Sequence, residues 1–138
     1  MTRIELKIPI VPIAKGRPRA TRSGHTYTPT KTRHYEESIR AAWRDKYGDA
    51  APLMGPVNLS VSFSLPRPKS MMWKTKPMHC DFHWRRPDLD NLLKAVNDAL
   101  DGLAWRDDGQ ITTLTASKWV AAGDEQPHIY IFIEELAK

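Results

Sequence analysis

The chain has 138 residues, of which 41% are hydrophobic and 27% are charged. This length predicts one domain, residues 1–138, that buries a core without disulfide bonds, and the composition excludes a wholly disordered chain. No stretch approaches the ~20 apolar residues of a membrane span, and charged residues interrupt the N-terminal apolar run, so we expect no signal peptide. The single cysteine, Cys80, excludes an internal disulfide and favours a cytoplasmic protein.

The net charge of +5 is distributed unevenly along the chain. Residues 1–34 carry eight Lys/Arg and one acid, residues 66–86 carry six and one, and residues 87–138 carry four Lys/Arg and ten acids. The basic blocks favour binding to a polyanion such as nucleic acid. An acidic block would repel the same polyanion, so we interpret it as a place where a cation lies between carboxylates and phosphate.

The first half of the chain predicts two strands and one helix. Residues 3–8 alternate polar and apolar side chains, which is typical of a half-buried strand, and residues 57–65 alternate strictly. Residues 14–30 are rich in glycine and proline and predict a long loop, whereas residues 31–47 carry an apolar stripe at helical spacing. Residues 66–87 contain four prolines and no steady period, which predicts a long loop or an ordered excursion.

The second half contains the strongest predicted helix, residues 88–101, with leucines at the spacing of a buried stripe. Residues 111–120 and 128–133 predict the last two strands, which we expect to form a hairpin across Gly123. The resulting order β-α-β-α-β-β predicts a small α/β (α+β) layer fold, in which two helices pack on a mixed β-sheet.

Carboxylates gather in and after this helix. Asp88 stands at the helix mouth, Asp90 and Lys94 share a helix face one turn apart, and Asp107 and Asp108 follow in a turn. If the turn comes back to the helix mouth, three hard oxygen ligands from two segments would suit Mg²⁺. Each residue also has a simpler interpretation: a helix cap, a first-turn carboxylate, a surface ion pair or an ordinary turn.

The segment 87–111 closely resembles the RusA family of Holliday-junction resolvases. The family pattern is an Asp-x-Asp-Asn-Leu-x-Lys helix, an Asp-Ala-Leu helix end and an Asp-Asp-x-Gln-Ile/Val turn. The matching residues here are Asp88, Asp90, Asn91, Leu92 and Lys94, then Asp98, Ala99 and Leu100, then Asp107, Asp108, Gln110 and Ile111. The run from Lys15 to Arg19 is similar to the basic loop of the family.

The resemblance implies a homodimeric, Mg²⁺-dependent endonuclease that nicks branched DNA, the four-way junction, in paired strands. Asp88, Asp90 and Asp108 match the catalytic, metal-binding carboxylates of the family, and Lys94 matches its catalytic lysine. Asp107 matches the preceding aspartate and receives no role. Mn²⁺ is expected to substitute for Mg²⁺, and neither a membrane nor a nucleotide cofactor is expected.

The basic residues of both positive blocks are the candidates for DNA contact. They are Lys15, Arg17, Arg19 and Arg22 in the first block, and Lys69, Lys74, Lys76, Arg85 and Arg86 in the second. The run from Met71 to Trp73 predicts either a wedge at a junction base or packing at a dimer interface. We favour packing for this run, and core or interface positions for Trp43, Trp105 and Trp119.

His79, Cys80 and His83 suggest zinc, but the sequence has no second Cys or His pair to complete a tetrahedral site, so ordinary loop side chains are the better interpretation. Two alternatives to a junction resolvase remain open at this point. One is a non-catalytic module of the same fold that binds DNA junctions. The other is a metal-dependent nuclease that acts on flaps or forks.

Overall fold

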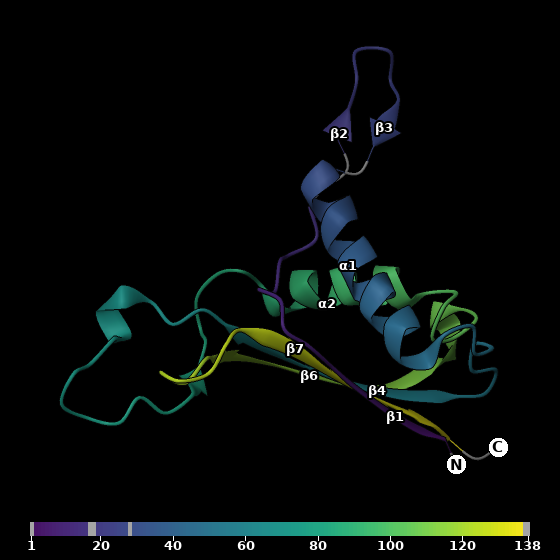
Figure 1. The fold of residues 1–138 in the computed structure, drawn as a ribbon. Coiled ribbons are helices and arrows are strands. Elements are labelled where there is room, and N and C mark those ends of the chain that lie inside the picture. Colours follow the sequence, from purple (N-terminus) through teal and green to yellow (C-terminus); the bar gives the residue numbers. More distant parts are fainter. Residues whose placement is uncertain (1, 17–18, 28, 137–138) are drawn as a thin grey trace.

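The computed structural model describes residues 2–16, 19–27 and 29–136, and it is built on a five-stranded mixed sheet (Figure 1). The spatial order of the strands is β1-β7-β4-β6-β5. Their bounds are β1 (Arg3–Ile8), β4 (Val57–Leu65), β5 (Asp81–Phe82), β6 (Ile111–Val120) and β7 (His128–Glu135). The two helices, α1 (Thr30–Tyr47) and α2 (Leu89–Leu100), lie on one face of this sheet. The predicted α+β class and the order of the long elements are therefore confirmed.

Strand β4 is the middle strand of the sheet, and its side chains alternate strictly between the two faces. Its five apolar residues are buried under the helices, while Asn58, Ser60 and Ser62 are only half-buried on the opposite face. β4 pairs with β6 in parallel and with β7 in antiparallel. The two neighbouring strands satisfy both edges of β4 while the helices bury its apolar face, and each fully buried aliphatic side chain contributes about 1.5–3 kcal/mol.

The predicted hairpin between β6 and β7 is wrong. β4 lies between these two strands, so the connection after Val120 crosses the end of β4 instead of making a tight turn. Gly123, in this connection, correctly predicted that the chain reverses its direction between β6 and β7. It could not indicate which strand the reversed segment would join, because that choice depends on where the most apolar strand lies.

Both helices bury one side; α1 ends at Tyr47 with Gly48 as its C-cap, whereas α2 ends at Leu100 with Asp101 as its C-cap and Gly102 after it. α1 buries Tyr35, Ile39 and Trp43 and is capped by Gly48, whose φ of +59° favours glycine. α2 buries five residues: Leu92, Ala95, Val96, Ala99 and Leu100. None of the described helices combines the length and the apolar character that a membrane span requires.

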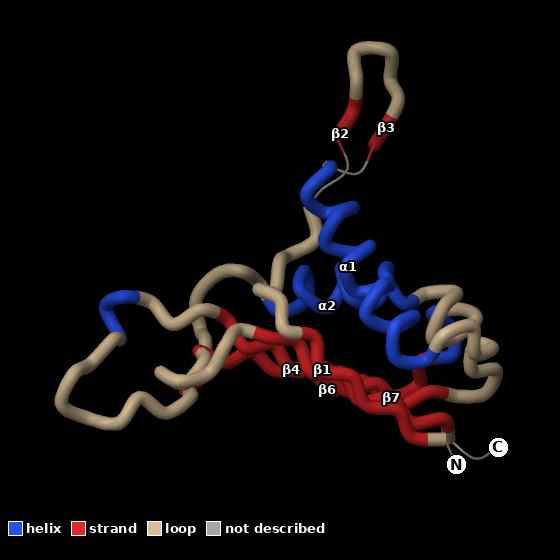
Figure 2. The backbone as a smooth tube through the Cα atoms, viewed as in Figure 1, coloured by secondary structure: helices blue, strands red, loops and turns tan. Residues whose placement is uncertain are grey.

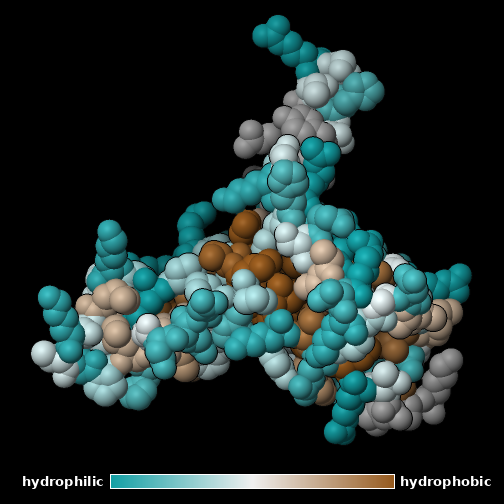
Figure 3. Space-filling view, in the orientation of Figure 1, coloured by the Kyte–Doolittle hydropathy of each residue, from teal (hydrophilic) through white to brown (hydrophobic). Residues whose placement is uncertain are grey.

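Two segments extend from this body, as the tube in Figure 2 shows. The predicted loop 14–30 contains a small hairpin of β2 (Arg19–Ala20) and β3 (Thr26–Tyr27), which stands beyond the start of α1. The predicted excursion 66–87 contains the short helix η1 (Lys69–Met71) and strand β5. Figure 3 shows that the visible parts of both segments are largely hydrophilic, whereas apolar side chains gather where α1 meets the body.

Candidate active site

The mouth of α2 carries two exposed carboxylates. Asp88 occupies the N-cap position with an extended backbone, and its side chain makes no cap hydrogen bond. Asp90 lies in the first turn, where its Oδ1 accepts a hydrogen bond from the backbone N–H of Asn91 at 3.0 Å. Asp88 also lines a shallow pocket together with Ala14, Arg86, Pro87 and Asn91. The oxygens of both carboxylates are thus accessible to a ligand, and basic residues flank the surface on which they lie.

Lys118, which sequence reasoning missed, fixes the chain in front of this helix mouth. Its Nζ donates hydrogen bonds to the backbone carbonyls of Arg85 and Pro87, the latter at 2.7 Å. The carbonyl of Lys118 accepts a further bond from the N–H of His83 at 3.2 Å. Lys118 lies near the end of β6, so it ties the start of α2 to the C-terminal half of that strand.

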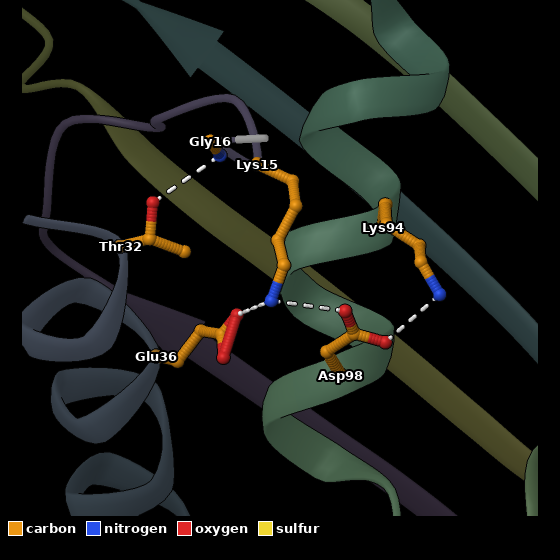
Figure 4. Close-up of polar contacts among 6 residues, drawn as sticks. All are labelled: Lys15, Gly16, Thr32, Glu36, Lys94 and Asp98. Carbon is orange, nitrogen blue, oxygen red and sulfur yellow. Dashed lines mark hydrogen bonds and ion pairs between the residues drawn. The ribbon is translucent and has the colours of Figure 1, made fainter. Parts of the chain in front are cut away.

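Lys94 and Lys15 share an acidic partner on α2 (Figure 4). Lys94 pairs with Asp98, one turn further along the helix, at 3.1 Å. The other oxygen of Asp98 lies 3.1 Å from the Nζ of Lys15, which also contacts Glu36 of α1 at 2.7 Å. Burial alone would lower the pKa of Lys15, but its hydrogen bonds to the carboxylates of Glu36 and Asp98 outweigh burial and raise that pKa.

Lys15 therefore joins the two helices, and its ammonium group is engaged inside the fold rather than presented to solvent. Its backbone N–H donates to the carbonyl of Asn91 at 2.9 Å, and the N–H of Gly16 donates to Oγ1 of Thr32 at 3.2 Å. A Cβ atom on Gly16 would lie only 2.7 Å from that hydroxyl oxygen. These contacts hold the chain at the root of the hairpin close to the helix mouth.

Asp107 and Asp108 lie at the start of the short helix η2 (Asp108–Gln110). The side chain of Asp107 caps this turn by accepting from the N–H of Gly109 at 3.0 Å, while Gln110 bonds back to the N–H of Asp107. Oδ1 of Asp108 accepts a hydrogen bond from Nε1 of the buried Trp105 at 2.8 Å. Asp107 thus shapes the turn, and Asp108 is held in a fixed orientation.

This turn lies at the C-terminal end of α2. Partial burial raises the pKa of Asp101, which follows the last residue of α2, and the neighbouring carboxylates of Asp108 and Asp107 raise it further. Asp90 and Asp101 are separated by about 17 Å along the helix axis, at 1.5 Å per residue. No three His, Cys, Asp or Glu side chains of the described chain are grouped so that they could hold a metal ion. One copy of the chain therefore does not bring Asp108 to Asp88 and Asp90.

The other predicted DNA contacts are spread over both projecting segments. Arg22 is exposed at the tip of the hairpin and Arg19 lies in β2, whereas Arg17 lies outside the described residues. Exposed basic residues of the second block flank the helix mouth and the excursion: Lys69, Lys74, Lys76, Arg85 and Arg86. Lys76 and Arg67 both stand over the ring of Trp73, at 4.1 and 4.7 Å from its centre.

These cation–π contacts show how part of segment 66–87 packs on itself. The ring of Trp73 contacts two cations and its backbone N–H donates to Sδ of Met78, so this part of the predicted wedge is packed within the segment itself, while Met72 remains exposed. Trp43 and Trp105 are buried in the core, as predicted. Cys80 is exposed and, among the described residues, joins no metal-holding group with His79 and His83.

Two exposed aromatic residues next to the helix mouth were not singled out from the sequence. Trp84 is 82% exposed, and Phe82 is 68% exposed and stacked on Trp119 at 4.8 Å. A pocket of about 220 Å³ lies between them and the start of the excursion. Large exposed aromatic rings flanked by arginines are typical of surfaces that stack on nucleic-acid bases. Their position in a short Asp-Phe-His-Trp-Arg-Arg run before the helix was the available signal.

Comparison with known proteins identifies the architecture. The profile of the family described as Endodeoxyribonuclease RusA matches residues 9–134. The chain belongs to the RusA endodeoxyribonuclease family. A Bacillus subtilis (strain 168) protein described as Uncharacterized protein YqaN is similar to it, with 32% identity over 134 residues that cover 91% of this chain and 92% of that protein. Membership in the RusA family makes the chain a DNA nuclease, and the acidic helix mouth is the natural candidate for its chemistry.

The donor set at the helix mouth fits a hard divalent cation. Mg²⁺ is usually held in proteins by one or two carboxylates, with water and substrate phosphate completing its octahedron. Asp88 and Asp90 are two such carboxylates, both exposed and both without an ion pair among the described residues. The side chains here thus suit Mg²⁺ or Mn²⁺ and offer none of the soft ligands that zinc prefers.

Proposed function

We propose that this RusA-family chain is an Mg²⁺-dependent endonuclease, with Mn²⁺ as a substitute, that resolves four-way DNA junctions by paired nicks as a homodimer. The observation that carries the proposal is the helix mouth of α2. Two unpaired carboxylates, Asp88 and Asp90, stand there on the family's motif and are flanked by exposed Arg85 and Arg86. A two-fold dimer supplies two equivalent sites, which a symmetric junction requires.

Asp88 and Asp90 would hold the cation, which when bound polarises the scissile phosphate and makes water a better nucleophile. Lys94 lies on the same side of the helix as Asp90, and its ammonium group is placed to stabilise negative charge that develops on the phosphate. Asp98 holds Lys94 by an ion pair and therefore orients it. Arg85 and Arg86 would bind neighbouring phosphates of the same strand.

The exposed aromatic residues support a preference for branched DNA. Bases at a junction centre are more easily unstacked than those of a continuous duplex, and an exposed ring can take their place in the stack. Trp84 lies four residues before Asp88, so a base stacked on it would bring its phosphate close to the carboxylates. The hairpin and the excursion would add phosphate contacts further out, with the salt dependence of counterion release.

The decisive experiment uses a labelled four-way junction and a linear duplex of the same sequence. We expect wild type with Mg²⁺ to make paired, symmetric nicks in the junction and to leave the duplex intact. Asp90→Asn should lose cleavage yet bind the junction as tightly or more tightly, because a carboxylate that repels phosphate has been neutralised. Glu37→Gln on the exposed face of α1 is the matched control and should cut normally.

The same panel separates the alternatives. A wild-type protein that binds the junction but cuts no branched DNA with either Mg²⁺ or Mn²⁺ would be a binding module. Cleavage restricted to added flap and fork substrates would instead identify a nuclease of a different specificity. Scattered cuts along the linear duplex would contradict structure selectivity altogether.

A further inference from the structure

The pocket beside the mouth of α2 has the size and the lining of a site for one flat ring system. It holds about 220 Å³, which is less than the roughly 300–1,000 Å³ of sites for drug-sized ligands. Met71 and Val120 supply apolar surface, and Phe82 and Trp84 supply aromatic rings. These two aromatic residues are 68% and 82% exposed in the described chain, and exposed apolar surface of this kind indicates a ligand or a partner. The pocket therefore suits a single aromatic ligand rather than an extended chain.

Arg67 fixes the wall that the excursion contributes to this pocket. Its Nε donates a hydrogen bond to the carbonyl of Met71 at 2.7 Å, and one terminal nitrogen donates to the carbonyls of His79 and Ala121 at 2.9 and 3.3 Å. Ala121 directly follows β6, so Arg67 ties the excursion to the end of the sheet. A wall that is held in this way is formed before a ligand arrives, which reduces the cost of binding.

The opposite wall is fixed by strand β6. The ring of Phe82 stacks on Trp119, with ring centres 4.8 Å apart and ring planes at 25°. Nε1 of Trp119 donates to Oγ of Ser117 at 2.8 Å, and the N–H of His83 donates to the carbonyl of Lys118 at 3.2 Å. Trp119 covers only part of the Phe82 ring, so the remaining surface of this oriented ring is free to stack on a base.

Asp81 supplies this pocket with a carboxylate. Its Oδ1 accepts a hydrogen bond from the N–H of Phe82 at 2.7 Å, whereas Oδ2 has no hydrogen bond or ion pair among the described residues. An ionised carboxylate only accepts hydrogen bonds, so the ligand must present an N–H group. Cytosine, adenine and guanine carry an exocyclic amino group, whereas thymine presents one N–H between two carbonyl oxygens that a carboxylate repels. Asp81 therefore favours a base with an amino group.

Basic side chains without an acidic partner accompany these lining residues. Arg85 lines the pocket and stands 5.7 Å from the centre of the Trp84 ring, and Arg86 and Lys69 are exposed next to lining residues. None of these three cations forms an ion pair within the part of the chain that the structure describes. Aromatic rings and a carboxylate in the pocket, with free cations beside them, match a nucleotide whose base enters while its phosphates stay outside.

The pocket also lies close to the carboxylates of α2. Lys118 holds the connecting chain, because its Nζ donates to the carbonyls of Arg85 and Pro87. From Arg85 to Asp88 the chain spans at most about 11 Å, at ~3.6 Å per residue. A base in the pocket and a phosphate at the carboxylates would thus belong to nearby nucleotides of one strand.

We propose that this pocket binds one unpaired base of branched DNA, turned out of its stack, and that Asp81 favours bases with an exocyclic amino group over thymine. The inference rests on the proposed function for its choice of DNA as the ligand. A base that is already unpaired at a branch point costs less to turn out than a base inside a duplex. The pocket thus contributes to the preference for branched DNA and makes that preference depend on the base at the branch point.

Binding to junctions that carry one unpaired nucleotide tests the pocket without cleavage. The nucleotide is cytosine, thymine or an abasic residue, placed in separate substrates at the branch point or at either of the next two positions, and binding is measured in EDTA. In at least one of these positions, we expect wild type to bind the cytosine substrate about tenfold more tightly than the abasic one, with thymine between them. Equal affinity for the cytosine and abasic substrates at every position would overturn the proposal.

Two variants separate the aromatic wall from the carboxylate. Phe82→Ala should lose the advantage of cytosine over the abasic residue, because the stacking surface is gone. Asp81→Asn should keep that advantage but bind cytosine and thymine alike, since an amide both donates and accepts hydrogen bonds. Met54→Ala removes an exposed apolar side chain elsewhere and Asp45→Asn removes an exposed acid from α1, so both are matched controls that should behave as wild type. An Asp81→Asn protein that still discriminates against thymine would show that Asp81 does not select the base.

These binding measurements do not depend on cleavage, so they separate the pocket from the proposed function. A protein that cuts no DNA with Mg²⁺ but shows the base preference would contradict the nuclease proposal and leave the pocket assignment standing. A protein that resolves junctions with Mg²⁺ but binds the cytosine and abasic substrates equally would keep the proposed function and refute the pocket assignment.

Discussion

The outer edges of β1 and β6 differ in whether side chains bond to their free backbone N–H and C=O groups. β1 alternates Arg3, Glu5 and Lys7 on its exposed face, and the outward carbonyl of Glu5 accepts hydrogen bonds from the side chains of Lys46 and Tyr47. β6 presents an uncharged run over 111–117, and no side chain of the described residues bonds to its outward groups there. The β1 edge is therefore protected by charged side chains and by two donors from α1, whereas the β6 edge has neither form of protection over residues 111–117 of the described chain.

A charge at the centre of the unprotected β6 edge should change the protein more than any other substitution considered below. Leu114→Lys would place an ammonium group on the edge of β6 and disfavour its pairing with a second copy, and because position 114 is exposed the change should cost the isolated fold little. We expect a monomer by light scattering at micromolar concentration and loss of nearly all junction cleavage. Glu5→Lys adds a lysine to the closed edge and should remain dimeric and active. A dimeric, active Leu114→Lys protein would show that β6 is not the interface.

A second change weakens the link between α1 and α2 without touching either edge of the sheet. Lys15→Met leaves the buried carboxylate of Glu36 without its cation, and we expect the free energy of unfolding to fall by about 2 kcal/mol at pH 7. Oligomeric state should not change. Urea unfolding monitored by tryptophan fluorescence gives the first quantity, and light scattering gives the second.

The same ion pair predicts a pH dependence of known sign. The pKa of Lys15 is raised in the folded protein, so its contribution to stability is complete below the ordinary lysine value of 10.5 and is lost as the pH rises through the higher folded value. As the pH rises from neutrality, the stability difference between wild type and Lys15→Met should therefore begin to shrink above about pH 10.5. A difference that instead disappears between pH 5 and 8 would contradict this assignment.

Loss of the Tyr47 hydroxyl should weaken the cap on β1 only slightly. Tyr47→Phe removes a hydroxyl that donates to the carbonyl of Glu5 at 2.7 Å, and we expect a loss of about 1 kcal/mol in unfolding free energy. Because Lys46 still covers the same carbonyl, the edge should stay closed and the oligomeric state unchanged. New, larger oligomers in this variant would mean that a single hydroxyl keeps this edge from pairing.

Local patterns predicted the elements well. The strict alternation of 57–65 and the leucine stripe of 88–101 reappear as β4 and α2, because a strand or a helix with one apolar face has few other ways to bury it. The carboxylates at the mouth of α2 were likewise visible, since their positions depend only on helix geometry. The resemblance to the RusA family, which was visible in residues 87–111, is confirmed by the family match over residues 9–134.

Long-range arrangements were not predictable in this way. The position of β4 between β6 and β7 replaced an expected hairpin, and nothing in the sequence indicated that Lys15, which we predict to contact DNA, also forms ion pairs with both helices. Lys118 and Trp84 received no role from the sequence, because a lysine in a strand and a tryptophan in a loop carry no periodic signal. Each of these outcomes depends on which segments meet in space.

By itself, the sequence determined which segments fold as helices and strands, and which residues carry the acidic chemistry, since both follow from side chains near one another in the chain. Only the tertiary structure decided that α2 and β6 run in opposite directions, with Asp88 at one end and Asp108 at the other. The physical reason is that the direction of β6 is fixed by its parallel pairing with the buried strand β4. That pairing separates the carboxylates within one chain and leaves an open strand edge between them.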